Sequence, residues 1–355
     1  MVSDDLFPGK LNFWICTMTI KDKLPDGTRI GFGTAPLGNM FRAVPEAEAH
    51  ATVRAAWAQG TRYFDTAPFY GAGLAELRLG ALLAREPRDS FVISTKVGRV
   101  ILDEVEDPAD RDLGEKAGVF AAGRANKIQL DYSADGTRRS IEGSLERLGL
   151  SRVDVVWVHD VAQDFHGDQW LARFEEARVG AFRALSRLRD EGVIKAWGLG
   201  VNRTEPCELL LDLQEFKPDG FLLAGRYTML DHAHALDRLM PAALQHGAEI
   251  VVGGPYSSGV LAGGNTFEYQ AATPMILAKV ERMREIARLH GVSLKAAALH
   301  FCLAHPAVAA VIPGASRPSR VAEDHAALAE TVPGAFWREL RKQGLVDPRA
   351  PLPID

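Results

Sequence analysis

The sequence predicts an α/β fold, a (β/α)8 TIM barrel with an N-terminal β-hairpin. Two observations favour it. Eight short runs rich in β-branched and aromatic residues recur along the chain, and they alternate with longer amphipathic segments. Eight strand–helix units in 355 residues are typical of such a barrel. A doubly wound parallel sheet stays open as the alternative, because strand order cannot be read from a sequence.

The elements follow one another in a regular order. We expect strands at 29–32, 61–65, 91–96, 153–158, 194–201, 220–224, 249–252 and 308–312. We expect helices at 46–59, 74–84, 137–147, 178–191, 207–214, 234–246, 275–290 with 294–304, and 318–330. Gly60, Gly149 and Gly247 directly follow three of these helices, and glycine readily adopts the left-handed conformation that ends a helix.

Two segments depart from this alternation. Residues 16–20 and 28–32 flank a Pro25-Asp26-Gly27 turn, which predicts a hairpin that plugs the bottom of the barrel. Residues 97–133 are rich in charge and glycine and lack periodicity, and a connection that long is usually a functional loop or a disordered one. It is a candidate lid over the substrate. Because no interdomain linker is visible, we treat 1–355 as a single domain.

Composition excludes several classes of function. The net charge of −5 and the absence of a basic block argue against nucleic acid as a partner. The N-terminus reads neither as a signal peptide nor as a membrane span, so we expect a cytoplasmic protein without membrane attachment. Three distant cysteines lack zinc spacing and are expected to be reduced core thiols. The expected partner is a small-molecule substrate, and the oligomeric state stays open.

Ionisable residues stand at the ends of three consecutive predicted strands. Asp65 ends the second strand and Tyr70 follows it, Lys96 ends the third, and His159 follows the fourth together with Asp160. In a barrel, carboxyl ends of strands form the active site. One charge at about 4 Å, with an effective dielectric near 20, is worth about 4 kcal/mol, so Lys96 is expected to bring the pKa of Tyr70 from 10 toward neutrality. Such a phenol is a general acid for a carbonyl or a general base for an alcohol, and His159 would orient the same oxygen.

Other interpretations of these residues were weighed. A strand-end Asp often caps the next helix, and a Tyr after Pro-Phe is often packed in the core. The HxH spacing of His232 and His234, with His159, would suit a metal-dependent barrel hydrolase, although a solvated helix start explains the first two better. A barrel that binds a cofactor as a sensor without turnover is the remaining alternative.

The strings YFDTAPFYG at 63–71, STK at 94–96 and VHD at 158–160 resemble the aldo-keto reductase superfamily, and the resemblance covers nearly the whole chain. The strings GLGVNRTEPCELLL and GGPYSSGVLAGG resemble the branch that holds D-threo-aldose 1-dehydrogenases, L-fucose and L-galactose dehydrogenases and pyridoxal 4-dehydrogenase. The resemblance implies a catalytic tetrad of Asp65, Tyr70, Lys96 and His159, with no metal.

The resemblance also implies a nicotinamide cofactor that lies across the barrel mouth. The cofactor-binding residues that it implies are Gly33, Thr34, Asn202, Tyr256, Ser257, Gly259, Leu261, Pro313, Gly314, Ala315, Arg320, Glu323 and Asp324. Substrate contacts are expected from Phe69, Asp160, Tyr227 and Trp337. Where the superfamily usually closes strand seven with an aromatic ring that stacks on the nicotinamide, this chain has Gly253-Gly254, so another group covers that face or none does.

The segment after strand eight bears on the choice of cofactor. The Lys and Ser that hold the 2′-phosphate of NADP across the superfamily are matched by Gly314 and Ala315, and Asp324 replaces a neutral amide. A carboxylate accepts from a ribose 2′-hydroxyl and repels a phosphate, so NAD is expected to be preferred. Arg320 and Arg317 keep NADP possible.

These residues lead to an expected activity. We expect an NAD(P)-dependent oxidoreductase that acts on CH–OH groups, an aldose 1-dehydrogenase that converts L-fucose or a D-threo-aldose to the lactone. Pyridoxal 4-dehydrogenase or a general aldehyde reductase is the alternative. The exact substrate and the physiological direction stay open.

Overall fold

Eight parallel strands form the centre of the molecule. The computed structural model describes residues 19–354 except 26, 109–110, 112–118 and 121. The strands neighbour one another in the order β1-β2-β3-β6-β7-β8-β9-β12, and bridges from Ile30 to Val311 and from Gly33 to Gly314 join the first to the last. The predicted barrel is therefore confirmed, and the doubly wound sheet is not formed. The strands are β1 (Phe32–Gly33), β2 (Tyr63–Asp65), β3 (Val92–Val97), β6 (Val155–His159), β7 (Ala196–Val201), β8 (Gly220–Ala224), β9 (Glu249–Gly253) and β12 (Val308–Ile312).

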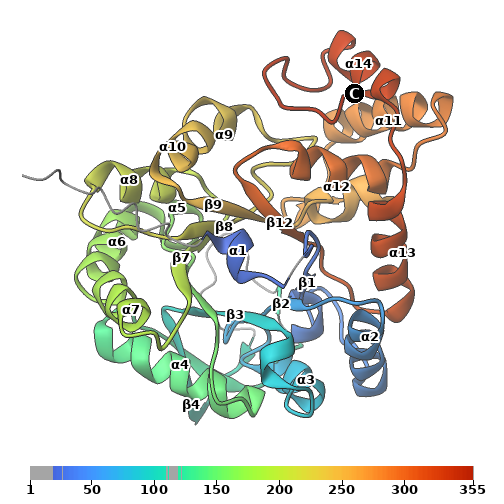
Figure 1. The fold of residues 1–355 in the computed structure, drawn as a ribbon. Coiled ribbons are helices and arrows are strands. Elements are labelled where there is room, and N and C mark those ends of the chain that lie inside the picture. The colour runs from blue at the N-terminus through green and yellow to red at the C-terminus, as the bar shows by residue number, and fades with distance from the viewer. Residues whose placement is uncertain (1–18, 26, 109–110, 112–118, 121, 355) are drawn as a thin grey trace, which may run out of the picture.

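Helices surround the strands (Figure 1). The predicted segment 234–246 divides into two helices at Arg238, whose φ of −134° is not helical. None of the described helices is long and apolar enough to cross a membrane. The helices are α1 (Ile20–Lys23), α2 (Glu46–Ala58), α3 (Leu74–Leu83), α4 (Ala134–Leu148), α5 (Gln163–His166), α6 (Trp170–Val179), α7 (Ala181–Asp190), α8 (Glu205–Leu213), α9 (Ala233–Asp237), α10 (Leu239–His246), α11 (Pro274–Leu289), α12 (Leu294–Ala304), α13 (Pro318–Ala329) and α14 (Gly334–Lys342).

A helical turn, α1, closes the bottom of the barrel. The expected N-terminal hairpin is therefore wrong for those of its residues that the structure describes. Thr19 caps α1 through its hydroxyl, which accepts from the Asp22 backbone N–H, while the Asp22 carboxylate accepts from the Thr19 N–H. This reciprocal pair is a capping box, which starts a helix. Ile20 is fully buried in the inner core with Tyr63 and Trp157. Residues 16–18 lie outside the described residues.

The irregular segment 97–133 contains an antiparallel pair of strands that its sequence did not reveal. β4 (Arg99–Val105) pairs with β5 (Asn126–Leu130), and Gly98 makes the bend before β4 with a φ of 103°. A Cβ atom at Gly98 would lie 2.3 Å from the ring of Tyr132, so a larger residue does not fit. This hairpin brings Arg99 and Phe120 to the same rim as the ends of β2, β3 and β6.

Candidate active site

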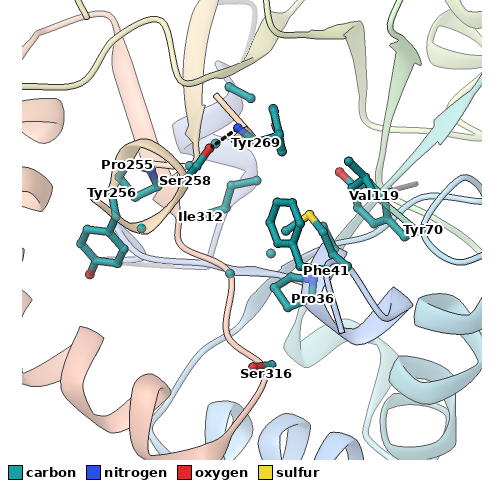
Figure 2. A pocket seen from close by; sticks show the side chains of 18 of the residues that line it. Pro36, Phe41, Tyr70, Val119, Pro255, Tyr256, Ser258, Tyr269, Ile312 and Ser316 are labelled. Carbon is teal, nitrogen blue, oxygen red and sulfur yellow. Dashed lines mark hydrogen bonds between the residues drawn. The ribbon is translucent and has the colours of Figure 1, made fainter. Parts of the chain in front are cut away.

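A cavity of about 560 Å³ opens at the carboxyl ends of the strands. Its lining comes from the loops after β1, β2, β6, β9 and β12, with Asp65 and Lys96 on its floor. Figure 2 shows Tyr70 and Val119 on one side of this cavity and Tyr256 and Pro255 on the other. The site predicted from the strand ends therefore lies where a barrel enzyme builds its active site.

Asp65 and Lys96 form a buried ion pair. Lys96 Nζ donates to Asp65 Oδ2 at 2.6 Å and to the carbonyl oxygen of Thr66 at 2.9 Å. Ser94 Oγ donates to the other carboxylate oxygen at 2.6 Å. Burial raises the pKa of Asp65 and lowers that of Lys96, and the attraction between the two groups opposes both shifts. Each charge therefore depends on its partner, because neither is stable alone in this environment.

Tyr70 and His159 lie beside this pair. Lys96 Nζ is 4.6 Å from the centroid of the Tyr70 ring, and the Tyr70 and His159 ring centroids are 5.9 Å apart. The Tyr132 hydroxyl donates to the His159 carbonyl oxygen at 2.7 Å and so fixes the end of β6. The structure therefore brings all four residues of the implied tetrad together.

The electrostatics of Tyr70 differ from the expectation. Burial raises the pKa of Tyr70 well above its usual value, Asp65 and Asp160 raise it further, and the cation that lowers it is Arg99. Lys96 does not bring this pKa near neutrality, because its charge is largely compensated by Asp65 at 2.6 Å. The phenol is thus protonated at neutral pH in the protein without ligands.

Arg99 is a site residue that the sequence did not single out. Its Nη1 lies 3.0 Å from Asp160 Oδ2, and the same carboxylate oxygen lies 3.4 Å from His159 Nε2. The Arg99 guanidinium also lies over the ring of Phe69, 4.2 Å from its centroid. Arg99 begins β4, so only the unforeseen hairpin places it in the site.

Aromatic rings line the end of the cavity that holds Tyr70. Phe69 contacts Phe120 and Phe165 edge to face, with centroids 5.2 and 6.1 Å apart, and Phe120 lies 5.6 Å from the Tyr70 ring. Phe120 belongs to the segment 97–133 that was expected to cover the substrate, and together with Val119 it lines the cavity. Phe120 and Phe165 carried no sequence signal beyond being aromatic.

Two expected substrate residues lie elsewhere. Tyr227 is fully buried, stacks on Phe301 at 5.5 Å and does not line the cavity. Trp337 is fully buried on α14 against Phe336 and also lies outside the lining. Both expectations are wrong, because these large rings complete the core between helices and sheet.

The expected cofactor residues divide into two groups. Those that line the cavity are Gly33, Asn202, Tyr256, Gly259, Gly314, Arg320, Glu323 and Asp324. Those that are not part of the lining are Thr34, Ser257, Leu261, Pro313 and Ala315. Ser257, for example, directs its hydroxyl to Thr228 Oγ1 at 2.9 Å, away from the cavity.

An aromatic side chain from another loop stands near Gly253-Gly254. A hairpin of β10 (Thr266–Phe267) and β11 (Gln270–Ala271) carries Tyr269 at its turn, where Glu268 and Tyr269 both have positive φ, 46° and 65°. The Tyr269 hydroxyl donates to Asn202 Oδ1 at 3.2 Å, and its backbone N–H donates to Ser258 Oγ at 3.1 Å, the bond drawn in Figure 2. Tyr269 lines the cavity beside the residue that was expected to hold the carboxamide.

The far end of the cavity is rich in charge. Asp324 Oδ1 accepts from the Tyr256 hydroxyl at 2.8 Å and lies 2.8 Å from Lys295 Nζ, so this carboxylate is compensated within the protein. From the loop after β1, Arg42 Nη2 donates to Ser316 Oγ at 3.1 Å. Arg42 and Lys295 are lining cations that the sequence did not single out.

The histidines of the alternative hydrolase site do not meet. His232 uses Nδ1 in a 2.7 Å contact with the Thr228 carbonyl oxygen and accepts from the Asp347 backbone N–H through Nε2 at 2.9 Å. His234 is exposed on α9, and His159 alone of the three lines the cavity. No cluster of metal-ligating residues appears among the residues described.

Comparisons with known proteins agree with this geometry. The chain is 38% identical to a pyridoxal 4-dehydrogenase from Microbacterium luteolum over 334 residues, covering 90% of this chain and 94% of that protein. It is 36% identical to a D-threo-aldose 1-dehydrogenase from a Pseudomonas species over 323 residues, covering 89% and 94%. The solved structure of a glycerol dehydrogenase from Gluconobacter oxydans shares the fold, with a TM-score of 0.66 at 20% identity over 92% of this chain and 94% of that one.

The family follows from these matches. The Aldo/keto reductase family matches residues 29–343, which is most of the chain. Members of this family are oxidoreductases that act on CH–OH or carbonyl groups and use nicotinamide cofactors, commonly NADP. With its barrel, its cavity and its two relatives above 35% identity, this chain belongs to the aldo-keto reductase family and is an oxidoreductase.

Proposed function

We propose that this protein is an NAD(P)-dependent aldose 1-dehydrogenase, with L-fucose or a D-threo-aldose as its substrate and Tyr70 as its general acid and base. One observation carries the proposal: Tyr70, His159 and the Lys96–Asp65 pair meet at one end of a cavity whose other end is lined by Arg317 and Arg320. The first end suits proton transfer at a small hydroxyl or carbonyl, and the second suits phosphate groups.

In the oxidation of the sugar, Tyr70 and His159 have different roles. The hydroxyl at the sugar C1 gives its proton to the phenolate form of Tyr70 while a C=O bond forms to give the lactone, and His159 holds the same oxygen. A nicotinamide bound in the cavity would supply the acceptor for the hydride of C1 and, in its oxidised form, a positive charge. In reduction the high pKa of Tyr70 keeps the phenol protonated, so it acts as the acid.

The residues present fit a dinucleotide. Gly254 and Gly259 line the cavity with φ of 56° and 101°, conformations that favour glycine and leave the backbone open to a ligand. Asn202 would hold the carboxamide, the backbone around Gly259 would hold the pyrophosphate, and Arg320 would hold the adenosine end. The Tyr269 hydroxyl donates to Asn202 Oδ1 and so fixes this amide, whose oxygen has a second lone pair for a carboxamide N–H.

For the cofactor we infer a preference for NAD. Gly314 lines the cavity and provides no cation, and a Cβ atom there would lie 3.0 Å from the Pro36 ring, so the position has little room for a Lys. Asp324 contributes less to this preference than its charge implies, because Lys295 compensates it. The inference therefore rests mainly on the missing cation at 314.

A second candidate, pyridoxal 4-dehydrogenase, is favoured by the aromatic rings around Tyr70. Phe69, Phe120 and Phe165 would contact a planar pyridine ring as well as a sugar face. The relative that is 38% identical carries this activity in its name. A general aldehyde reductase is the third possibility that the same chemistry allows.

Steady-state kinetics with a substrate panel test the proposal. We expect L-fucose with NAD to give the highest kcat/KM among L-fucose, D-arabinose, pyridoxal and butanal, each measured with NAD(H) and NADP(H) by absorbance at the nicotinamide band. A higher value for pyridoxal would replace the first candidate by the second, and a higher value for butanal would favour the aldehyde reductase. No turnover with any substrate would contradict the proposed function.

A further inference from the structure

Asp160, which lines the cavity, forms a buried ion pair with Arg99, and neither residue belongs to the tetrad. Their side chains are 4% and 7% exposed, with Arg99 Nη1 3.0 Å from Asp160 Oδ2. Burying such a pair removes two charges from water, and apolar residues of similar volume often stabilise a fold equally well. A buried pair whose carboxylate lines a ligand cavity therefore calls for an explanation in terms of the ligand.

The pair is held in one position. The Arg99 guanidinium lies 4.2 Å from the Phe69 ring centroid and 5.1 Å from that of Phe165. Asp160 has a φ of 52°, and its backbone N–H donates to the Gly200 carbonyl oxygen at 2.9 Å. The backbone hydrogen bond and Arg99 together therefore fix the position of the Asp160 carboxylate. An acceptor held in one position can select one orientation of a substrate hydroxyl.

The carboxylate lies next to the place of the reacting oxygen. Asp160 Oδ2 is 3.4 Å from His159 Nε2, the ring nitrogen that faces this carboxylate in the cavity. A substrate oxygen that binds Nε2 brings a hydroxyl on the neighbouring carbon within reach of Asp160, which lines the same cavity. That hydroxyl supplies a hydrogen-bond donor to the buried carboxylate.

We propose that Asp160, positioned by Arg99, accepts a hydrogen bond from a second substrate hydroxyl next to the reacting one. The inference rests on the proposed function, because it requires the reacting oxygen to lie between Tyr70 and His159. It names a substrate class: a cyclic sugar with a hydroxyl at C2, or an aromatic alcohol with an adjacent phenol, and not a simple alcohol or aldehyde. Asp160 is then a substrate-binding residue and Arg99 a positioning residue.

The expected selectivity in kcat/KM can be estimated from a substrate analogue that lacks the second hydroxyl. An analogue without the second hydroxyl still binds His159 Nε2 but gives Asp160 one hydrogen-bond donor fewer than the full substrate does. Sites built to bind a substrate hydroxyl reject the analogue that lacks it by at least about tenfold in kcat/KM. Asp160 also raises the pKa of Tyr70, but that effect is common to every substrate and cancels in a ratio of two substrates.

The experiment compares matched substrate pairs. The kcat/KM of the full-length protein is measured for L-fucose against 2-deoxy-L-fucose and for pyridoxal against 3-deoxypyridoxal, in the wild type and in Asp160→Asn. For the pair that is turned over faster, we expect a wild-type ratio of at least about tenfold in favour of the hydroxylated member. In Asp160→Asn this ratio is expected to fall to below a third of its wild-type value. Asp168→Asn removes an exposed carboxylate nearby and is expected to keep the ratio.

Each outcome decides the inference. A wild-type ratio smaller than tenfold overturns it without any variant, and so does a ratio that Asp160→Asn leaves unchanged while overall activity falls. Should Asp160→Asn not fold, Arg99→Lys takes its place, since it keeps the charge but loses the planar fork that holds the carboxylate, and the same ratio decides. Turnover without selectivity contradicts this inference alone, whereas no turnover of either pair contradicts the proposed function together with it.

Discussion

Replacing Lys96 by Met tests how the ion pair acts on Tyr70. Lys96 Nζ lies 4.6 Å from the Tyr70 ring centroid and 2.6 Å from Asp65 Oδ2. At that distance from the ring, with an effective dielectric near 20, one unit charge is worth about 3.6 kcal/mol. Lys96→Met removes this attraction and leaves the Asp65 charge in place, so we expect the pKa of Tyr70 to rise.

The sign of the shift follows from the charge that remains. Lys96→Met leaves Asp65 facing Tyr70 without its cation, and a nearby carboxylate raises the pKa of a phenol. At saturating NAD, the positive charge of the oxidised nicotinamide would favour the phenolate and bring this ionisation toward the measured range. The rising limb of kcat/KM for alcohol oxidation, measured under that condition from pH 6 to 10.5, should therefore move to higher pH in the variant. Lys127→Met, which removes a half-exposed lysine on β5, serves as the control. If the rising limb of the Lys96→Met profile lies within half a pH unit of that of the wild type, Lys96 does not act on Tyr70 through its charge.

Three further predictions address the cofactor, the substrate end and the fold. Arg320→Ala should lower kcat/KM for NADP by about tenfold and leave that for NAD nearly unchanged, since a charge-assisted hydrogen bond to a phosphate is worth about 1.5 to 3 kcal/mol; equal losses would show that Arg320 does not read the 2′-position. Phe120→Ala should raise the KM for pyridoxal more than that for L-fucose, and an equal rise would remove the aromatic argument for the second candidate. Burial lowers the pKa of His305 to about 4 from 6.5, so its neutral form adds stability that is fully present above pH 6.5 and lost as the pH falls toward 4. Urea unfolding at pH 7 and 4.5 should show that His305→Gln reduces this pH dependence by up to about 2 kcal/mol, and exposed His234→Gln should not.

Much of the fold and the tetrad could be predicted because the signals are local. Each strand is a short, mainly apolar run, and Asp65, Lys96 and His159 stand at or beside the ends of three of them. Parallel strands in a closed barrel bring their carboxyl ends to one rim. Asp65 and Tyr70 are five positions apart, and Lys96 and His159 close neighbouring strands, so topology alone places these four side chains together.

The rest of the site depends on long-range contacts that leave no local signal. Because β4 pairs with β5, Arg99 contacts the cavity residues Asp160 and Phe69, and Phe120 lines the cavity itself. Tyr269 reaches the cavity through a turn in which two non-glycine residues have positive φ. Tyr227 and Trp337 were expected to contact the substrate but are buried in the core. A large aromatic ring suits a core as well as a pocket, so the residue type alone does not distinguish the two. The N-terminal hairpin was mistaken because the capping pair of Thr19 and Asp22 outweighs the β-branched run around it.

The central claim is that Tyr70 transfers the proton that accompanies hydride transfer. The most direct measurement is the single-turnover rate of Tyr70→Phe with L-fucose and NAD, together with the Kd of NADH by fluorescence for the same variant. The account predicts a rate lowered by about 10² to 10⁴-fold and a Kd within about twofold of the wild type, because the hydroxyl contacts the reacting oxygen and contributes little to ground-state binding of the dinucleotide. A variant that keeps more than a tenth of the wild-type rate would contradict it.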